Sequence, residues 1–356
     1  MTFSKDIITL NAKGLRNVKN RNKVFNQLSG KSAGIICLQE THSHPPDEKF
    51  WPSGLGGGSM YFSHGETNAR GVAIFIRKNI DFKVINKYND SEGRIVSVIL
   101  ELEGKKLCIA SVYAPNISPN PSDKIAHESF LELLFNHLHD MKVNFDISDF
   151  IVAGDFNIIK DRQYDAFGGS PTLYPKSIAQ LNKISDEFEL TDIYRELNPT
   201  DRLFTFSPGG LNVRNLFRRL DYIFIPETWT QDVMTTDIIP ASHSDHKILH
   251  LTMRKGKNTK GSGIWRHNDL LNTNDDYLSE FKSLFPDWTK QANTLSDPRS
   301  RWDFIKWKMK THSRDFSIRL KKKRTSFKDS VEKRLAKCDN ELRANPDDRE
   351  IAQRYM

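Results

Sequence analysis

Polar residues that can bind a cation or move a proton stand where apolar runs of this sequence end. Asn11 follows IITL, Glu40 follows GIICLQ, and Asp155 and Asn157 come after FIVAG. A carboxylate is costly to bury unless it is paired. Each of these residues alone is also typical of a turn. Several of them at the ends of separate runs indicate side chains that converge on one site.

Two further acids and a histidine extend this set. Asp221 lies between Leu220 and the run YIFI, and Asp245 and His246 open the run HKILHLTM. A carboxylate beside an imidazole fixes its tautomer and favours its protonated form, which can donate a hydrogen bond to a phosphate. A lone histidine is more often a surface residue, and only its place beside acidic residues points to chemistry.

Hydrolysis of a phosphodiester is the chemistry that these residue types suit. The negative phosphate repels hydroxide, so a cation has to neutralise its oxygens. Mg²⁺ prefers oxygen ligands, whereas the cysteines show no zinc-type spacing; they are Cys37, Cys108 and Cys338. We therefore expect Mg²⁺, for which Mn²⁺ can substitute, beside a carboxylate–histidine pair.

Short apolar runs rich in Val, Ile and Phe recur through residues 1–256 and predict β-strands. They are DIITL (6–10), GIICL (34–38), GVAIFI (71–76), RIVSVILEL (94–102), KLCIASVY (106–113), DFIVAG (149–154), LDYIFI (220–225) and HKILHLTM (246–253). Amphipathic helices are predicted between some of them, at 128–141 and 178–190. The predicted apolar face of the first helix consists of Phe130, Leu133, Leu134, Leu138 and Met141. Strands with interposed helices indicate an α/β or α+β domain.

The chain beyond residue 253 has a different character. The polar stretch 254–263 is typical of a linker. Apolar residues three or four apart, including Trp302, then predict a helical extension over 264–356. Residues 257–356 hold 23 Lys and Arg but 15 Asp and Glu, which accounts for the whole net charge of +8. A basic face favours a nucleic-acid partner, although a solvated helix face explains it equally. The LysLysLysArg cluster at 321–324 fits a nucleic-acid or nuclear-import patch, but a solvated helix face explains it better.

Composition and the absence of targeting patterns exclude several classes of protein. Hydrophobic residues make up 37% and charged residues 28%, which suits a folded globular chain. No basic segment followed by an apolar run opens the sequence, and no stretch approaches the roughly 20 apolar residues of a membrane span. Three cysteines without paired spacing favour a reducing compartment. We expect an intracellular protein without a membrane partner.

Six segments occur in an order that resembles the endonuclease/exonuclease/phosphatase superfamily, which includes DNase I, exonuclease III and abasic-site endonucleases. They are TLNAKGL (9–15), CLQETH (37–42), SVYAPN (111–116), VAGDFN (152–157), RRLDYIFI (218–225) and SHSDHKIL (242–249). Other segments resemble the endonuclease domain of non-LTR (LINE-type) retrotransposon polyproteins. They are NARGVAIFIRK (68–78), AGDFNIIKD (153–161), FTFSP (204–208) and SDHK (244–247). The stretch 264–288 is similar to the part that follows this nuclease, ahead of the reverse transcriptase.

This resemblance implies a fold and an activity. The fold is an α/β four-layered sandwich of two packed, mostly antiparallel sheets flanked by helices over 1–253, with the linker 254–263 and the basic helical extension 264–356. The implied enzyme is a Mg²⁺-dependent endonuclease that nicks one strand of double-stranded DNA. The 3′-hydroxyl it leaves would prime target-primed reverse transcription. Element RNA and a downstream reverse transcriptase domain would be further partners, and the site of action would be nuclear.

The resemblance also implies roles for residues. Glu40 would be the main metal ligand, helped by Asn11. Asp155 would activate or orient the attacking water and His246 would bind the phosphate. The other implied catalytic residues are Asp221, Tyr113, Asn157 and Asp245. The implied phosphate or DNA contacts are Thr205, Ser244, Arg214, Arg218 and Arg219.

Two features bear on how DNA would be held. The segment 207–219 lies between two predicted strands, and its arginines could reach into a minor groove. A plain surface loop would look the same. Lys13 departs from the superfamily, which often has Asp or Asn at that position, so that it would either weaken metal binding or contact a DNA phosphate.

Three other functions fit parts of this pattern. An abasic-site repair endonuclease shares the implied catalytic residues, and a phosphatase of inositol phosphates or lipids belongs to the same superfamily. A decayed copy would bind DNA without cutting it. The complete set of ionisable residues disfavours decay, while the extension and Lys13 favour the retrotransposon assignment over repair.

Overall fold

The structure, a computed structural model, describes residues 5–31, 33–66, 68–169, 172–208, 216–254 and 267–344. The chain divides into two compact units, Met1–Lys257 and Asn258–Met356. All of the expected linker 254–263 except Arg254 lies outside the described residues, and so does Arg214.

Two six-stranded sheets form the centre of the first unit. One has the strand order β13-β14-β1-β2-β4-β3. Its strands are β1 (Ile7–Asn11), β2 (Ile35–Gln39), β3 (Gly58–Ser63), β4 (Val72–Arg77), β13 (Val233–Pro240) and β14 (Lys247–Met253). Strands β1 and β2 run parallel, and the other neighbours are antiparallel.

The other sheet has the strand order β10-β12-β8-β7-β6-β5. Its strands are β5 (Lys83–Asn89), β6 (Ile95–Leu102), β7 (Lys105–Tyr113), β8 (Asp149–Asp155), β10 (Leu190–Asp192) and β12 (Asp221–Pro226). Here β7 and β8 are the parallel pair. A separate pair of short strands, β9 (Ala166–Phe167) and β11 (Phe217–Arg218), is antiparallel.

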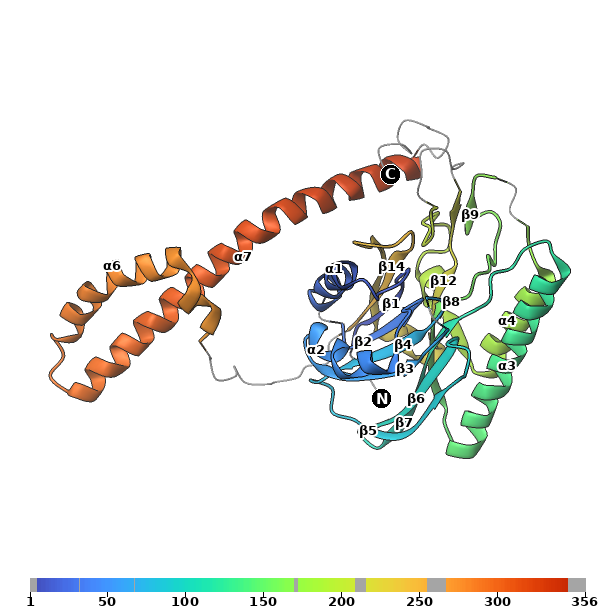
Figure 1. Ribbon diagram of the computed structural model, residues 1–356, viewed down its shortest axis with the longest axis horizontal. Helices are drawn as coiled ribbons and strands as arrows, with labels where there is room; N and C mark the ends of the chain where they lie inside the picture. The colour runs from blue at the N-terminus through green and yellow to red at the C-terminus, as the bar shows by residue number, and fades with distance from the viewer. Residues whose placement is uncertain are drawn as a thin grey trace. The chain divides into compact units, whose positions relative to one another are not determined.

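The sheets pack face to face over an apolar core, to which both contribute buried residues such as Ile74, Val98 and Ile109. Helices α1 (Val18–Ser29) and α2 (Trp51–Gly54) cover the outer face of the first sheet. Helices α3 (Pro121–Phe145) and α4 (Pro175–Glu187) cover the second (Figure 1). Strands buried on both faces explain why their sequences are apolar almost throughout. The expected four-layered sandwich is confirmed.

Each of the eight apolar runs overlaps a strand, and the expected helix 128–141 lies in α3. The expected helix 178–190 overlaps α4, which ends earlier, at Glu187, because Leu190 already belongs to β10. The apolar face predicted for the first helix is wrong at Leu133, which is 49% exposed. Leu131 is buried in its place, because α3 packs on the sheet through a stripe turned slightly from the predicted one. The sequence pattern did not single out β3, β5 or β13, whose burial is partial. Short helical elements complete the unit: η1 (Pro45–Lys49), α5 (Ile193–Leu197) and η2 (Glu227–Asp232).

The second unit is helical, as expected for the extension. It contains η3 (Asp269–Thr273), α6 (Asp275–Ala292) and the long helix α7 (Pro298–Ala344). Leu271, Tyr277 and Phe316 form its small core, and the hydroxyls of Tyr277 and Ser313 lie 2.8 Å apart. Trp302, expected on the apolar face, is 57% exposed. None of the helices in the described ranges combines the length and the apolar character needed to cross a membrane.

Candidate active site

Strand direction brings the polar residues of the first sheet to one edge. Because β1 and β2 run parallel with Asn11 opposite Gln39, their carboxyl ends meet, and Glu40 follows at once. Strand β14 is antiparallel to β1, so His246, immediately before it, arrives at the same edge.

The second sheet repeats this arrangement. Strands β7 and β8 are parallel, and Tyr113 pairs with Asp155 in register. Strand β12 is antiparallel to β8 and starts with Asp221 opposite Asp155. A Cβ atom on Gly154 would lie 2.0 Å from the carbonyl oxygen of Val112. Only glycine therefore permits this close approach of the strands beside Asp155.

The amide of Asn11 links the two sheets at this edge. The Nδ2 of Asn11 donates to Glu40 Oε1 at 2.8 Å and to Asp155 Oδ2 at 2.9 Å. Its Oδ1 accepts the backbone N–H of Lys13 at 3.1 Å, which fixes the orientation of the amide. Asn11 and Asp155 are buried, whereas the carboxylate of Glu40 is 26% exposed. Glu40 is therefore the acid of this group that solvent and ligands can reach.

The loop after β8 positions Asn157. Its backbone N–H donates to Asp155 Oδ1 at 2.9 Å, and its side-chain Nδ2 donates to the carbonyl of Ala114 at 2.9 Å. Asn157 and Glu40 have φ angles of 49° and 46°, in the left-handed region that costs a side-chain-bearing residue free energy. Surrounding hydrogen bonds hold both residues in these strained turns.

A buried carboxylate–histidine pair lies next to Asp155. His246 Nδ1 is 2.8 Å from Asp221 Oδ2, and His246 Nε2 is 3.8 Å from Asp155 Oδ2. Burial opposes the charge on His246, but Asp221 and Asp155 together raise its pKa above the ordinary value. Burial, followed by repulsion from Asp221, also raises the pKa of Asp155. The imidazole is accordingly held in its protonated form with Nε2 directed toward Asp155.

Tyr113 completes the group from the end of β7. Burial and the charges of Glu40 and Asp155 raise the pKa of its phenol, so the hydroxyl keeps its proton and can donate a hydrogen bond. The guanidinium of Arg94 lies 5.4 Å from the centre of the Tyr113 ring and donates to the Tyr113 carbonyl at 3.1 Å. Arg94 was not singled out from the sequence, since nothing in its spacing distinguishes it from other surface arginines.

Several of these side chains line a cavity of ≈ 540 Å³. Its polar lining includes Glu40, Asp155, Asn157, Asp245 and His246 together with Lys13 and Arg218. The ring of Phe206 lies on one side, with its centre 4.9 Å from that of His246. The cavity therefore brings together residues from all six sequence segments. Some of these residues lie far apart in the sequence, such as Lys13 and Asp245, which are 232 positions apart.

Two donor sets at the site could hold a metal ion. Ligand atoms of Asp155, Asp221 and His246 all lie within 4.8 Å of one another. Ligation by His246 would require its imidazole to give up the proton that Asp221 and Asp155 favour. Glu40 and Asp155 offer carboxylate oxygens on either side of Asn11, and Asp221 Oδ1 is buried without a hydrogen-bond partner among the described residues. Oxygen donors of this kind suit Mg²⁺ or Mn²⁺.

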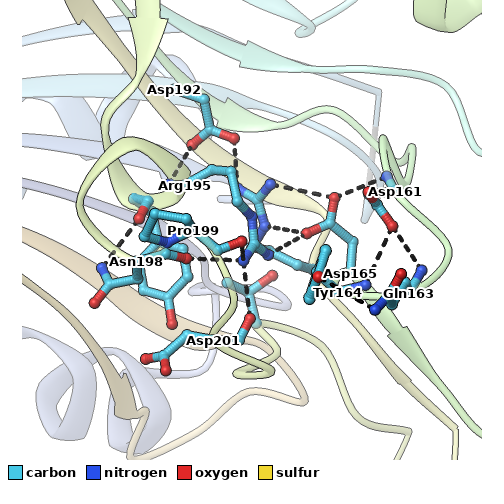
Figure 2. A network of polar contacts seen from close by, with 12 residues as sticks. Asp161, Gln163, Tyr164, Asp165, Asp192, Arg195, Asn198, Pro199 and Asp201 are labelled. Carbon is cyan, nitrogen blue, oxygen red and sulfur yellow. Dashed lines mark hydrogen bonds and ion pairs between the residues drawn. The ribbon is translucent and has the colours of Figure 1, made fainter.

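The structure corrects the expected DNA contact of Arg219. Its side chain is 1% exposed, with Nε 2.7 Å from Asp165 Oδ1 and Nη1 2.8 Å from Asp192 Oδ2. Arg195 joins the same network through Asp165 at 2.6 Å, and Figure 2 shows these two residues with Asp192 amid further polar contacts. An arginine enclosed by two carboxylates cannot reach a nucleic acid, so Arg219 is a structural residue.

Thr205 is corrected for the same reason. It is fully buried, and its hydroxyl accepts the backbone N–H groups of Leu220 and Asp221 at 3.0 and 3.1 Å. Thr205 therefore positions the start of β12 and has no surface to offer a phosphate.

Ser244 and Arg218 lie nearer the cavity. The hydroxyl of Ser244 donates to the Asn11 carbonyl at 2.7 Å and accepts the His246 N–H at 2.9 Å, so it ties β1 to the histidine. Arg218 lines the cavity while donating to the carbonyls of Phe167, Phe217 and Gly168. Their contacts with a substrate stay predictions.

The sequence of the chain decides its family. The sequence profile described as the Endonuclease/Exonuclease/phosphatase family matches residues 8–246, more than half of the chain. The chain belongs to this family. The match extends from β1 to His246 and so encloses every residue that the fold brings to the cavity.

The chain spans very different shares of two similar proteins. The transposon TX1 uncharacterized 149 kDa protein of Xenopus laevis is 23% identical over 314 residues, which are 87% of this chain and 23% of that protein. An exodeoxyribonuclease of Bacillus subtilis is 20% identical over 261 residues, 68% of this chain and 98% of the bacterial protein. The chain thus spans less than a quarter of the transposon relative and nearly all of the bacterial one.

Several solved structures share the fold. The AP endonuclease LMAP of Leishmania major superposes with a TM-score of 0.60 and 22% identity over 71% of this chain and 88% of that one. The catalytic domain of Xenopus laevis APE2 gives a TM-score of 0.57 and 22% identity over 71% and 94%. At this level of identity the likeness establishes the fold alone.

Proposed function

We propose that this protein is a divalent-metal-dependent DNA endonuclease that nicks one strand and leaves a 3′-hydroxyl. The observation that carries the proposal is the Asn11–Glu40–Asp155 cluster beside the buried His246–Asp221 pair, at the wall of one cavity. An exodeoxyribonuclease and AP endonucleases among its relatives favour DNA as the substrate.

The residues of the site would divide the chemistry as follows. Protonated His246, held by Asp221, donates a hydrogen bond to a phosphate oxygen and stabilises the charge that develops there. Asp155 accepts the proton of the attacking water, and its raised pKa makes it a better base than an ordinary aspartate. Asn157 holds the water or the phosphate, and the phenol of Tyr113 donates to the scissile phosphate. Asp245 stays close to this group at the cavity wall.

The accessible carboxylate of Glu40, with Asn11 beside it, would hold Mg²⁺ or Mn²⁺. When bound, the cation supplies positive charge to the phosphoryl oxygens. In the arrangement described, Asn11 presents its amide nitrogen to Glu40, so ligation through its oxygen requires the amide to turn and to release the N–H of Lys13.

The wider role that we infer is target-site cleavage for a retrotransposon. The transposon relative, which the chain matches over 87% of its own length and so beyond the nuclease unit, supports it. The partners would be double-stranded DNA, the element RNA and a downstream reverse transcriptase domain, acting in the nucleus. The domains would be the nuclease over 1–253, the linker 254–263 and the basic extension 264–356.

A nicking assay tests the activity. Supercoiled plasmid incubated with the full chain should become open circles with Mg²⁺ or Mn²⁺ and stay supercoiled in EDTA. Glu40→Gln, which keeps the shape of the side chain and removes its charge, should require much more Mg²⁺ for the same rate. Undiminished nicking in EDTA would refute the metal dependence, and a plasmid left intact under all conditions would refute the activity.

The fold of AP endonucleases favours one second candidate, cleavage at abasic sites. Two duplexes that differ by a single synthetic abasic nucleotide separate the proposals. Comparable cutting of both supports a general nicking enzyme. Cutting confined to the abasic duplex would support repair instead.

A further inference from the structure

Lys13 is the cation of the cavity with the most freedom to move. Its side chain is 56% exposed, and its ammonium is 2.7 Å from Asp245 Oδ2, the one polar contact recorded for it among the described residues. Of the other basic groups in the lining, Arg218 is held by backbone carbonyls and His246 by Asp221.

The backbone of Lys13 is fixed even though its side chain is not. Its N–H donates to Asn11 Oδ1, and the next N–H, of Gly14, donates to the Glu40 carbonyl at 2.8 Å. Lys13 has a φ of 50°, a strained value that these contacts maintain. The ammonium is thus tethered at the end of β1 by a flexible chain, within reach of the cavity that contains Glu40 and Asp155.

Lys13 offsets part of the negative charge that the acids of the cavity present to an anionic substrate. Glu40, Asp155 and Asp245 line it, and Asp221 lies behind them, so an anionic substrate meets several carboxylates. Lys13 neutralises Asp245 and leaves Glu40 as the accessible acid that faces a divalent cation. An exposed ion pair at 2.7 Å contributes little stability, so exchanging Asp245 for a phosphate oxygen costs little.

We propose that Lys13 is a phosphate-binding residue of this cavity, whose ammonium rests on Asp245 in the free protein and transfers to a backbone phosphate of the incoming duplex. The proposal rests on the proposed nuclease function and identifies a residue through which the site binds the DNA backbone. Two consequences follow. Lys13 adds one phosphate contact to DNA binding, and its charge lowers the affinity of the free protein for a divalent cation.

Binding of a duplex oligonucleotide in EDTA, where no cleavage occurs, tests the first consequence. Lys13→Met should weaken binding about tenfold at low salt. It should also make the slope of log affinity against log salt shallower by about 0.9. Lys13→Arg should keep both properties. The matched control is Lys19→Met, an exposed lysine of α1 outside the cavity with the same change of charge, and it should behave like the parent.

A double-mutant cycle separates phosphate binding from a merely structural ion pair. Asp245→Asn releases Lys13, so it should tighten DNA binding in the parent and have a smaller effect in Lys13→Met. A structural pair predicts the opposite, because each single substitution would then weaken binding by loosening the loop. Equal affinity and slope for Lys13→Met and Lys19→Met would overturn the proposal.

Mn²⁺ binding to the DNA-free protein, followed by electron paramagnetic resonance, tests the second consequence. Lys13→Met should bind Mn²⁺ about fivefold more tightly, since a positive charge near the acids has been removed. Weaker binding would contradict the proposal. If the parent nicks no plasmid, the proposed activity fails, while the duplex and Mn²⁺ titrations still decide the role of Lys13.

Discussion

The substitution Asp165→Asn removes one acid from the buried network around Arg219. Asp165 is 1% exposed. Its carboxylate accepts hydrogen bonds from Arg219 Nε at 2.7 Å and Nη2 at 3.2 Å, from Arg195 at 2.6 Å and from the Asp161 N–H at 3.0 Å. Two arginines face Asp165 and Asp192, so their charges cancel. The substitution leaves one buried positive charge without a counterpart.

The expected loss is large because Arg219 cannot reach solvent. Breaking a buried ion pair by removing one partner costs about 3–5 kcal/mol. Arg195 is 21% exposed and keeps part of its hydration, so we expect the lower end, about 3 kcal/mol. Against a typical total of roughly 5–15 kcal/mol, that is a major fraction of the free energy of unfolding. Urea denaturation of the parent and the variant measures the difference.

The pH dependence provides an independent check. Burial raises the pKa of Asp165, but Arg219 and Arg195 outweigh it and hold the pKa below its usual value. The stabilisation is therefore full above the unfolded pKa of about 3.9 and is lost as the pH falls through the folded pKa. The parent should lose stability below about pH 4 more steeply than Asp165→Asn.

A surface ion pair supplies the control. Glu187→Gln removes the partner of Lys142, a contact of 3.0 Å between side chains more than a third exposed, and should change the unfolding free energy little. If Asp165→Asn were as stable as Glu187→Gln at pH 7, the network would not hold this part of the fold.

Three further predictions concern the site, the core and the extension. His246→Ala should lower the nicking rate by about 10²–10⁴-fold, and Asp221→Asn should also lower it severely. Single-turnover assays measure the rate, and binding of uncleaved DNA should change little in either variant. An unchanged rate would remove both residues from the mechanism. Burial lowers the pKa of His137, next to Ser97 and Tyr88, to about 4. The unfolded chain therefore takes up the proton first, and the parent should lose about 1.5 kcal/mol of unfolding free energy between pH 6.5 and pH 5. His137→Gln should remove that loss in urea denaturation, and an equal slope in both proteins would contradict the assignment. Truncation after Lys257 should leave a folded, active nuclease with the same site preference. Salt titrations should show a shallower salt dependence of DNA binding for the truncated protein than for the full chain. Equal slopes would show that the basic charge of the extension is merely solvated.

The sequence by itself predicted eight of the strands and the acids and histidine at their ends, and its resemblance to a known superfamily predicted the layered fold. An acid such as Asp155 at the end of an apolar run is informative because burial penalises it unless it has a function or a partner. Parallel pairing of neighbouring strands then places such residues at the same edge of the sheet. The order of the motifs along the sequence predicts this arrangement.

Only the tertiary structure decided which polar residues face the cavity. Arg218 and Arg219 are adjacent in the sequence, yet one lines the cavity and the other is enclosed by Asp165 and Asp192. Successive residues of an extended chain point to opposite sides, and the partners of Arg219 come from distant segments that no local pattern identifies. The pairing of Lys13 with Asp245 across 232 residues is of the same kind, because it depends on how β1 and β14 are placed side by side.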